Sequence, residues 1–342
     1  MTHSLRNGIR LAVHGQRLTS WIVNGGLAVT RDVSMRLCIT SAILGVTLVA
    51  GPAAAQSLRA AYLYTLSDFT GSIRVDWSRV AVDRQRNEVY ALHQNTVRVF
   101  NESGMEVYRF GDDLDIGHIV DVAVDDRGDV FLLSYRDSKA AIVRCNYRGE
   151  LQARITLKRL PAEFSDFVPN RMVFQQGRFF LASSSGLKIV TADRDGHFVE
   201  GFDLVPLLDL EEQDRGSAEL GGFSVDPAGN VLMTIPVLFR AFVMSRDGTV
   251  TAFGRAGSAP GRFNIVGGIA RDREGNVLVV DKAKGAVLVF DPTLKFVSQF
   301  ATRGSKPGQL LTPGDLAIDD RGTVYVTQAG KRGVSVFRLT HD

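Results

Sequence analysis

Cysteine and histidine are scarce in this chain of 342 residues, which contains 2 cysteines and 6 histidines. Cys38 lies in an apolar N-terminal segment, so beyond that segment Cys145 has no partner for an internal disulfide. A fold without disulfides needs a large hydrophobic core. Cys145 ends an apolar run with no histidine nearby, which predicts a buried structural thiol rather than a nucleophile.

Excess charge of one sign is also missing. The formal net charge is +3, but residues 1–55 carry five arginines against one aspartate, which leaves about −1 for the remainder. A near-neutral body gives no electrostatic reason to expect nucleic-acid binding. The chain also has no glycine-rich phosphate loop, nucleophile elbow or Ser/His/Asp arrangement.

The N-terminal region has the features of a secretory signal. Arg36 follows Met35, residues 39–50 are apolar, and residues 53–55 are three alanines before Gln56. This pattern predicts a signal peptide over residues 35–55, too short to span a membrane, and a periplasmic or secreted protein without a span after cleavage. The alternative is an uncleaved anchor. Residues 1–34 are interpreted as a disordered leader or a gene-model extension upstream of Met35.

One short motif recurs six times, as an apolar run that ends in most copies in Asp, at intervals of 42 to 51 residues. Four copies are followed by a turn that closes on glycine, and the first copy uses Asn87 instead, a residue type that also tolerates the left-handed conformation. The motif residues are Val80–Asp83, Val122–Asp125, Met172–Gln175, Phe223–Asp226, Ile269–Asp272 and Leu316–Asp319.

Each copy continues into further short strands rich in Val, Phe and Leu, which is typical of an antiparallel meander. Five copies have a fourth strand, and the sixth ends at Asp342 without one. The segment 61–66 has strand character and no repeat of its own, so we expect it to pair with 334–337 and close a ring. The sequence therefore predicts an all-β, six-bladed β-propeller of four-stranded antiparallel blades over residues 56–342.

The repeats resemble NHL repeats. Residues 257–263 and 304–310 match best, together with the turns 272–276 and 319–323, while the first four copies are more degenerate. The resemblance covers residues 57–342 and implies the propeller fold. It implies little about function, because this scaffold serves binding proteins and enzymes alike.

One position just before each inner apolar run should lie near the axis. Around the ring it holds, in order, Arg79, Asp121, Arg171, Gly222, Gly268 and Asp315. One interpretation is a polar pocket whose arginines hold a carboxylate or phosphate, with the two glycines opening one side. The favoured interpretation is an ion-pair network that locks blades 1, 2, 3 and 6.

Two long connections, residues 158–169 and 205–221, flank the third blade and carry Phe164, Phe167 and several acidic residues. They are predicted either to cover the channel mouth as a binding surface or to be solvated loops fixed by an apolar staple. The acidic turns lack the ligand series of a calcium loop, so we interpret them as turn chemistry.

Metal ligands are few at the predicted axis. Amidating and streptogramin-type lyases of this fold need axial histidines, and only His118 has a comparable place. Gluconolactonase-like propellers hold a divalent ion with Glu, Asn and Asp, and only Asn170 matches. We therefore predict no cofactor and no metal site.

The predicted ligand-binding residues are Arg79, Asp121, Arg171, Asp315, Asn170 and His118. The expected function is binding of a protein, peptide or small acidic ligand, by a monomer or as part of a larger assembly. The alternative is a metal-dependent lyase or lactonase at the channel mouth, and a third hypothesis is a purely structural assembly part.

Overall fold

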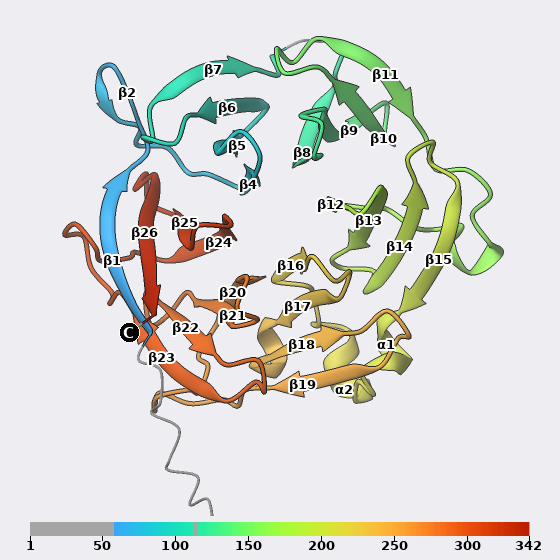
Figure 1. Cartoon of the computed structure of the whole chain (residues 1–342). Helices are drawn as coiled ribbons and strands as arrows, with labels where there is room; N and C mark the ends of the chain where they lie inside the picture. Colours follow the sequence, from blue (N-terminus) through green and yellow to red (C-terminus); the bar gives the residue numbers. More distant parts are fainter. Residues whose placement is uncertain (1–57, 113–114, 342) are drawn as a thin grey trace, which may run out of the picture. The chain divides into compact units, whose positions relative to one another are not determined.

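The computed structural model describes residues 58–112 and 115–341, and the predicted leader and signal peptide lie outside these ranges. Six four-stranded antiparallel sheets form the blades of a propeller around a central axis (Figure 1). Each blade runs from an inner strand at the axis to an outer strand at the rim. The predicted six-bladed, nearly all-β fold is confirmed.

The strands of blades 1 to 3 follow one another along the chain. Blade 1 contains β4 (Arg79–Asp83), β5 (Glu88–His93), β6 (Thr96–Phe100) and β7 (Glu106–Phe110). Blade 2 contains β8 (His118–Val124), β9 (Val130–Arg136), β10 (Lys139–Cys145) and β11 (Leu151–Ile155). Blade 3 contains β12 (Arg171–Gln175), β13 (Arg178–Ser183), β14 (Lys188–Asp193) and β15 (Phe198–Asp203).

Blades 4 and 5 repeat this order, and blade 6 takes its outer strand from the other end of the chain. Blade 4 contains β16 (Gly222–Val225), β17 (Val231–Ile235), β18 (Arg240–Met244) and β19 (Val250–Phe253). Blade 5 contains β20 (Val266–Arg271), β21 (Val277–Asp281), β22 (Ala286–Phe290) and β23 (Phe296–Phe300). Blade 6 contains β24 (Pro313–Ile318), β25 (Thr323–Gln328), β26 (Val334–His341) and β1 (Leu58–Thr65).

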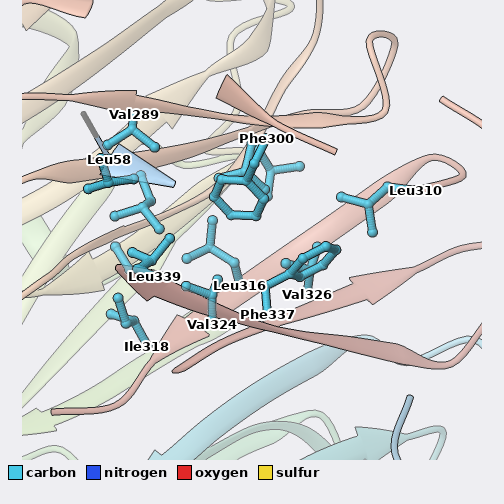
Figure 2. Close-up of a cluster of buried hydrophobic side chains, with 14 residues drawn as sticks. Leu58, Val289, Phe300, Leu310, Leu316, Ile318, Val324, Val326, Phe337 and Leu339 are labelled. Carbon is cyan, nitrogen blue, oxygen red and sulfur yellow. The ribbon is translucent and has the colours of Figure 1, made fainter. Parts of the chain in front are cut away.

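The ring closes as predicted, because β1 pairs antiparallel with β26. Tyr62 lies opposite Phe337 and Thr65 lies opposite Ser335. Closure also buries apolar surface. Leu58 packs in the core between blades 5 and 6 with Val289 and other side chains, which gather in Figure 2. The N-terminal strand thus holds the ring through backbone hydrogen bonds and through packing.

The turns between first and second strands depend on a buried aspartate in five blades. In blade 2 the Asp125 Oδ1 accepts the backbone N–H of Arg127 at 2.9 Å and of Asp129 at 2.8 Å. The turn then closes on Gly128 with φ 82°, and in blade 1 Asn87 takes φ 53° as predicted. The five carboxylates therefore serve their own turns, as the sequence indicates. They are Asp83, Asp125, Asp226, Asp272 and Asp319.

Helices are short. In the described part of the chain they are α1 (Leu204–Leu207), α2 (Glu212–Arg215) and two 3₁₀ turns, Ala162–Phe164 and Pro236–Leu238. None of the helices within the described ranges is long and apolar enough to cross a membrane. A two-stranded hairpin, β2 (Ser67–Asp68) and β3 (Gly71–Ser72), separates β1 from blade 1.

Candidate functional site

A cavity of about 530 Å³ runs along the axis between the inner strands. At one end it begins at the first residues of these strands, and at the other it continues onto the turns that join first and second strands. We call this second side the turn face. The cavity therefore spans the full height of the inner strands. Its lining at the turn face includes Arg84, Gln85, Asp126, Gln176 and Asp320.

Four predicted site residues meet at the opposite end, which we call the charged end. It consists of Arg79, Asp121, Arg171 and Asp315, and all four line the cavity. The Arg79 Nε lies 3.8 Å from the Asp121 Oδ1. The Asp121 Oδ2 accepts the N–H of Met172 at 2.8 Å, and the Asp315 Oδ2 accepts the N–H of Val80 at 3.3 Å. These contacts connect blades 6, 1, 2 and 3, but one of the three is an ion pair and the other two are hydrogen bonds from backbone N–H groups, so the predicted ion-pair network is present only in part.

Burial makes these two carboxylates weak acids. Asp121 is 5% exposed, and desolvation raises its pKa to about 7 although Arg79 and the N–H of Met172 act in the opposite direction. Desolvation also raises the pKa of Asp315, again against the effect of Arg79. Asp121 is thus partly neutral near pH 7, whereas the guanidinium groups keep their charge. The charged end is therefore electropositive.

Arg171 differs from Arg79 in its partners. It is half-buried, and its Nη1 donates to the carbonyl of its own neighbour Asn170 at 3.0 Å. Within the described ranges it forms no ion pair. Its guanidinium therefore reaches the cavity with donors left for another acceptor.

The two axial glycines do not open one side of the ring, contrary to the expectation from the sequence. A Cβ on Gly222 would lie 2.4 Å from the carbonyl oxygen of Gly267, and one on Gly268 would lie 2.6 Å from the N atom of Leu316. Glycine is required here because the inner strands of blades 4, 5 and 6 approach each other too closely for a side chain. The charged end is consequently narrow on this side.

Three residues of the cavity lining each have a buried polar atom with no hydrogen-bond partner among the residues that the structure describes. These atoms are the Nε of Arg79, the Oγ of Ser224 and the Nε of Arg271. Arg271 also pairs with Asp226 through its Nη1 at 2.5 Å. The sequence did not single out Ser224 or Arg271 as site residues. Their signal was their place in the repeat, where Ser224 aligns with Ala81 of blade 1 and Arg271 aligns with Val82.

His118 and Asn170 do not join the other four predicted residues. His118 begins β8, is exposed and lies opposite Tyr135, outside the cavity lining. The Asn170 Oδ1 accepts from the N–H of Ser184 at 3.0 Å and from its hydroxyl at 2.8 Å, so it fixes the loop of its own blade. Neither residue lines the cavity with the axial carboxylates.

One group of three potential metal ligands is found among the described residues, and it lies at the rim. Asp193, Asp195 and His197 belong to the turn between β14 and β15. The Asp193 Oδ1 accepts the N–H of Asp195 at 3.0 Å and of His197 at 2.8 Å. This carboxylate is therefore explained by turn formation, and the group lies apart from the cavity lining.

The long connections lie outside the cavity lining, except for Gly221 at the end of the second one. Phe164 is buried in the core of blade 3, and a Cβ on Gly201 of the outer strand would lie 2.4 Å from its ring. Lys188 binds Asp166 at 2.6 Å. Helix α1 contacts β15, and Figure 1 shows α1 and α2 near outer strands rather than at the centre. The apolar-staple interpretation is therefore the one that the structure supports.

Comparison with known proteins identifies the fold without identifying a family. No model of a protein family matches the chain, and no curated protein is detectably similar to it. Among solved structures, a protein of unknown function from Bacteroides thetaiotaomicron is similar with a TM-score of 0.61, at 15% identity over 83% of this chain and 76% of that one.

Two further structures have the same fold. An auxiliary nutrient binding protein from Bacteroides ovatus gives a TM-score of 0.55, at 14% identity over 83% of this chain and 77% of that one. A streptogramin B lyase gives 0.52, at 13% identity over 83% of this chain and 98% of that one. At this identity the likeness concerns the fold alone.

Proposed function

We propose that this chain is an exported, NHL-type propeller that binds a small molecule in its central cavity. The observation that carries the proposal is the continuous axial cavity, which is lined by charged side chains from five of the six blades, namely Arg79, Asp121, Arg171, Arg271 and Asp315. A concave cavity that combines apolar side chains with a few converging charged groups is the usual form of a small-molecule site. The volume of about 530 Å³ is within the usual range of ligand pockets.

Related folds are compatible with binding and with catalysis, since one structural neighbour is a nutrient binding protein and another is a lyase. The positions of side chains favour binding. The lyase alternative required His118 to converge with axial carboxylates, but His118 is exposed and outside the cavity lining. Export is proposed from the signal-like segment 35–55 of the sequence.

Co-purification from the native exported fraction tests this function. The tagged protein would be denatured after purification, and released small molecules and metals would be quantified by mass spectrometry. Ala317→Leu adds a branched side chain to the cavity wall. Ala252→Leu makes the same change on the exposed outer strand β19 and is the matched control. Circular dichroism would establish that both variants fold.

The expected result is one small molecule bound near stoichiometry to the wild type and to Ala252→Leu, and absent from folded Ala317→Leu. Equal occupancy in folded Ala317→Leu would place the ligand elsewhere and overturn the proposal. A stoichiometric divalent ion without any small molecule would instead support the metal-dependent lyase or lactonase. Retention of a protein partner by all three forms would move the binding site to the rim.

A further inference from the structure

We propose that the cavity selects a small organic anion with an apolar body, which enters from the turn face and binds Arg171 through its carboxylate. This inference rests on the proposed binding function and specifies its ligand class and orientation. Four features of the cavity support it: the free donors of Arg171, the charge of the end where it lies, the apolar wall, and the difference between the two ends.

The first feature is the contrast between the two axial arginines. Arg79 lies 3.8 Å from the Asp121 carboxylate, so it already has an acidic partner within the protein. Arg171 has the Asn170 carbonyl as its neighbour at 3.0 Å and no ion pair within the described part of the chain. A guanidinium has five donors in a planar fork, which matches a carboxylate. Arg171 is therefore the anchor that the protein leaves available.

The second feature is the local charge. Asp121 and Asp315 direct carboxylate oxygens to the N–H groups of Met172 and Val80, in the neighbouring blades. Burial raises the pKa of both carboxyl groups, to about 7 for Asp121. The end that holds two guanidinium groups thus carries less than two compensating negative charges near neutral pH, which favours an anion over a cation.

The third feature is the wall between the two ends. Small and apolar side chains from the middle of the inner strands line it, together with Arg271, whose Nη1 is paired with Asp226. Such a wall accepts an apolar body and would leave a charged group in the middle of the ligand without a partner. The ligand is therefore expected to be charged at one end. The apolar lining residues are Ala81, Val82, Ala123, Val124, Val173, Phe223, Ala270 and Ala317.

The fourth feature is the difference between the two ends. At the charged end, Gly222 and Gly268 bring the backbones of blades 4, 5 and 6 into close approach, and Arg79 and Asp121 connect blades 1 and 2. At the turn face, the lining extends beyond the strands onto residues such as Gln85 and Gln176. A ligand that enters from the turn face would carry its anionic group toward the narrow end, where Arg171 lies.

Isothermal titration calorimetry at pH 7 tests the ligand class with three probes. Sodium octanoate has both a carboxylate and an apolar chain, octanamide lacks the charge, and acetate lacks the chain. We expect octanoate to bind at least tenfold more tightly than either of the others. Equal affinity for octanoate and octanamide, or no binding of octanoate by the wild type, would overturn the anionic ligand class.

Three variants test the anchor. Arg171→Gln should weaken octanoate binding at least tenfold, and Arg171→Lys should restore part of the loss because it keeps the charge. Arg178→Gln removes a half-exposed arginine of the same blade outside the cavity, and it should change affinity less than twofold. Wild-type affinity in folded Arg171→Gln would exclude Arg171 as the anchor.

The octanoate titration and the co-purification experiment can give independent outcomes. A molecule that co-purifies with the wild type and is lost in Ala317→Leu would keep the cavity as a binding site even where octanoate does not bind. In that case only the ligand class would be wrong. Unchanged occupancy in folded Ala317→Leu would remove both proposals.

Discussion

The carboxylate of Asp121 in blade 2 accepts the backbone N–H of Met172 in blade 3 at 2.8 Å. The same relationship joins Asp315 in blade 6 to Val80 in blade 1 at 3.3 Å. Inner strands of neighbouring blades do not share sheet hydrogen bonds, so these side chains satisfy donors at the exposed edge of the next blade. The axial carboxylates therefore hold adjacent blades in register. Because they also line the cavity, they contribute to its electrostatic potential.

The first prediction concerns the pH dependence of stability. The pKa of Asp121 is about 7 in the folded protein and near 3.9 in an unfolded chain. Between about pH 3.9 and pH 7 the Asp121 carboxyl group is protonated more in the folded state than in the unfolded state. Its contribution therefore lowers the free energy of unfolding as pH rises, by up to about 1.4 kcal/mol per pH unit. Asp121→Asn should remove this dependence.

Urea denaturation from pH 4 to pH 8 would measure it. Other carboxylates titrate in the same experiment, so the quantity of interest is the difference in unfolding free energy between variant and wild type. The unfolding free energy of Asp121→Asn should increase relative to that of the wild type as pH rises toward 7. A difference that stays constant over the range would contradict the raised pKa.

The second prediction concerns the close approach of blades 4 and 5. Gly222→Ala would place a Cβ 2.4 Å from the carbonyl oxygen of Gly267, and backbone must move to accommodate it. We expect a loss of about 1–3 kcal/mol in unfolding free energy. Gly216→Ala is the control, since its φ is −72° and no heavy atom lies within 4 Å of the added Cβ. A loss of the same size in the control would point to a general effect of removing glycine.

The sequence predicted the fold because each blade repeats a local pattern. Strand length, turn glycines and the missing sixth outer strand are all visible without tertiary information, so the pairing of β1 with β26 could be predicted. The four charged axial residues could also be found, since one position of the repeat determines their place.

Features that depend on contacts between blades could not be predicted in this way. In the sequence, Gly222 and Gly268 suggested that one side of the axial site is open. In the structure, backbone atoms of the neighbouring blades lie so close to both glycines that this side is narrow. The placement of Phe164 against Gly201 depends on how the long connection folds back, which its length does not determine. Whether the Ser224 Oγ and the Arg271 Nε find a hydrogen-bond partner likewise depends on all of their neighbours together.

The third prediction concerns ring closure. Phe337 of β26 is 2% exposed and its ring lies 5.2 Å from that of Phe300 in blade 5 and 5.7 Å from that of Tyr62 in β1. Phe337→Ala should lower the unfolding free energy by about 3–5 kcal/mol. Phe69→Ala, at the tip of the β2–β3 hairpin with 94% exposure, should change it by less than about 0.5 kcal/mol. Chemical denaturation would measure both losses. A loss in Phe337→Ala as small as that in Phe69→Ala would indicate that packing at the ring closure contributes little to stability.

The fourth prediction separates the rim from the cavity. Phe164 is 5% exposed, packs on Gly201 and lies 5.8 Å from the ring of Phe198. Phe164→Ala should lower the unfolding free energy by about 3 kcal/mol, because it leaves a void in the core of blade 3. Since the connection 158–169 does not line the cavity, affinity for a cavity ligand should change less than twofold. Isothermal titration calorimetry on folded Phe164→Ala would measure this affinity. Wild-type stability together with a large loss of affinity would contradict the prediction and indicate that the connection covers the channel.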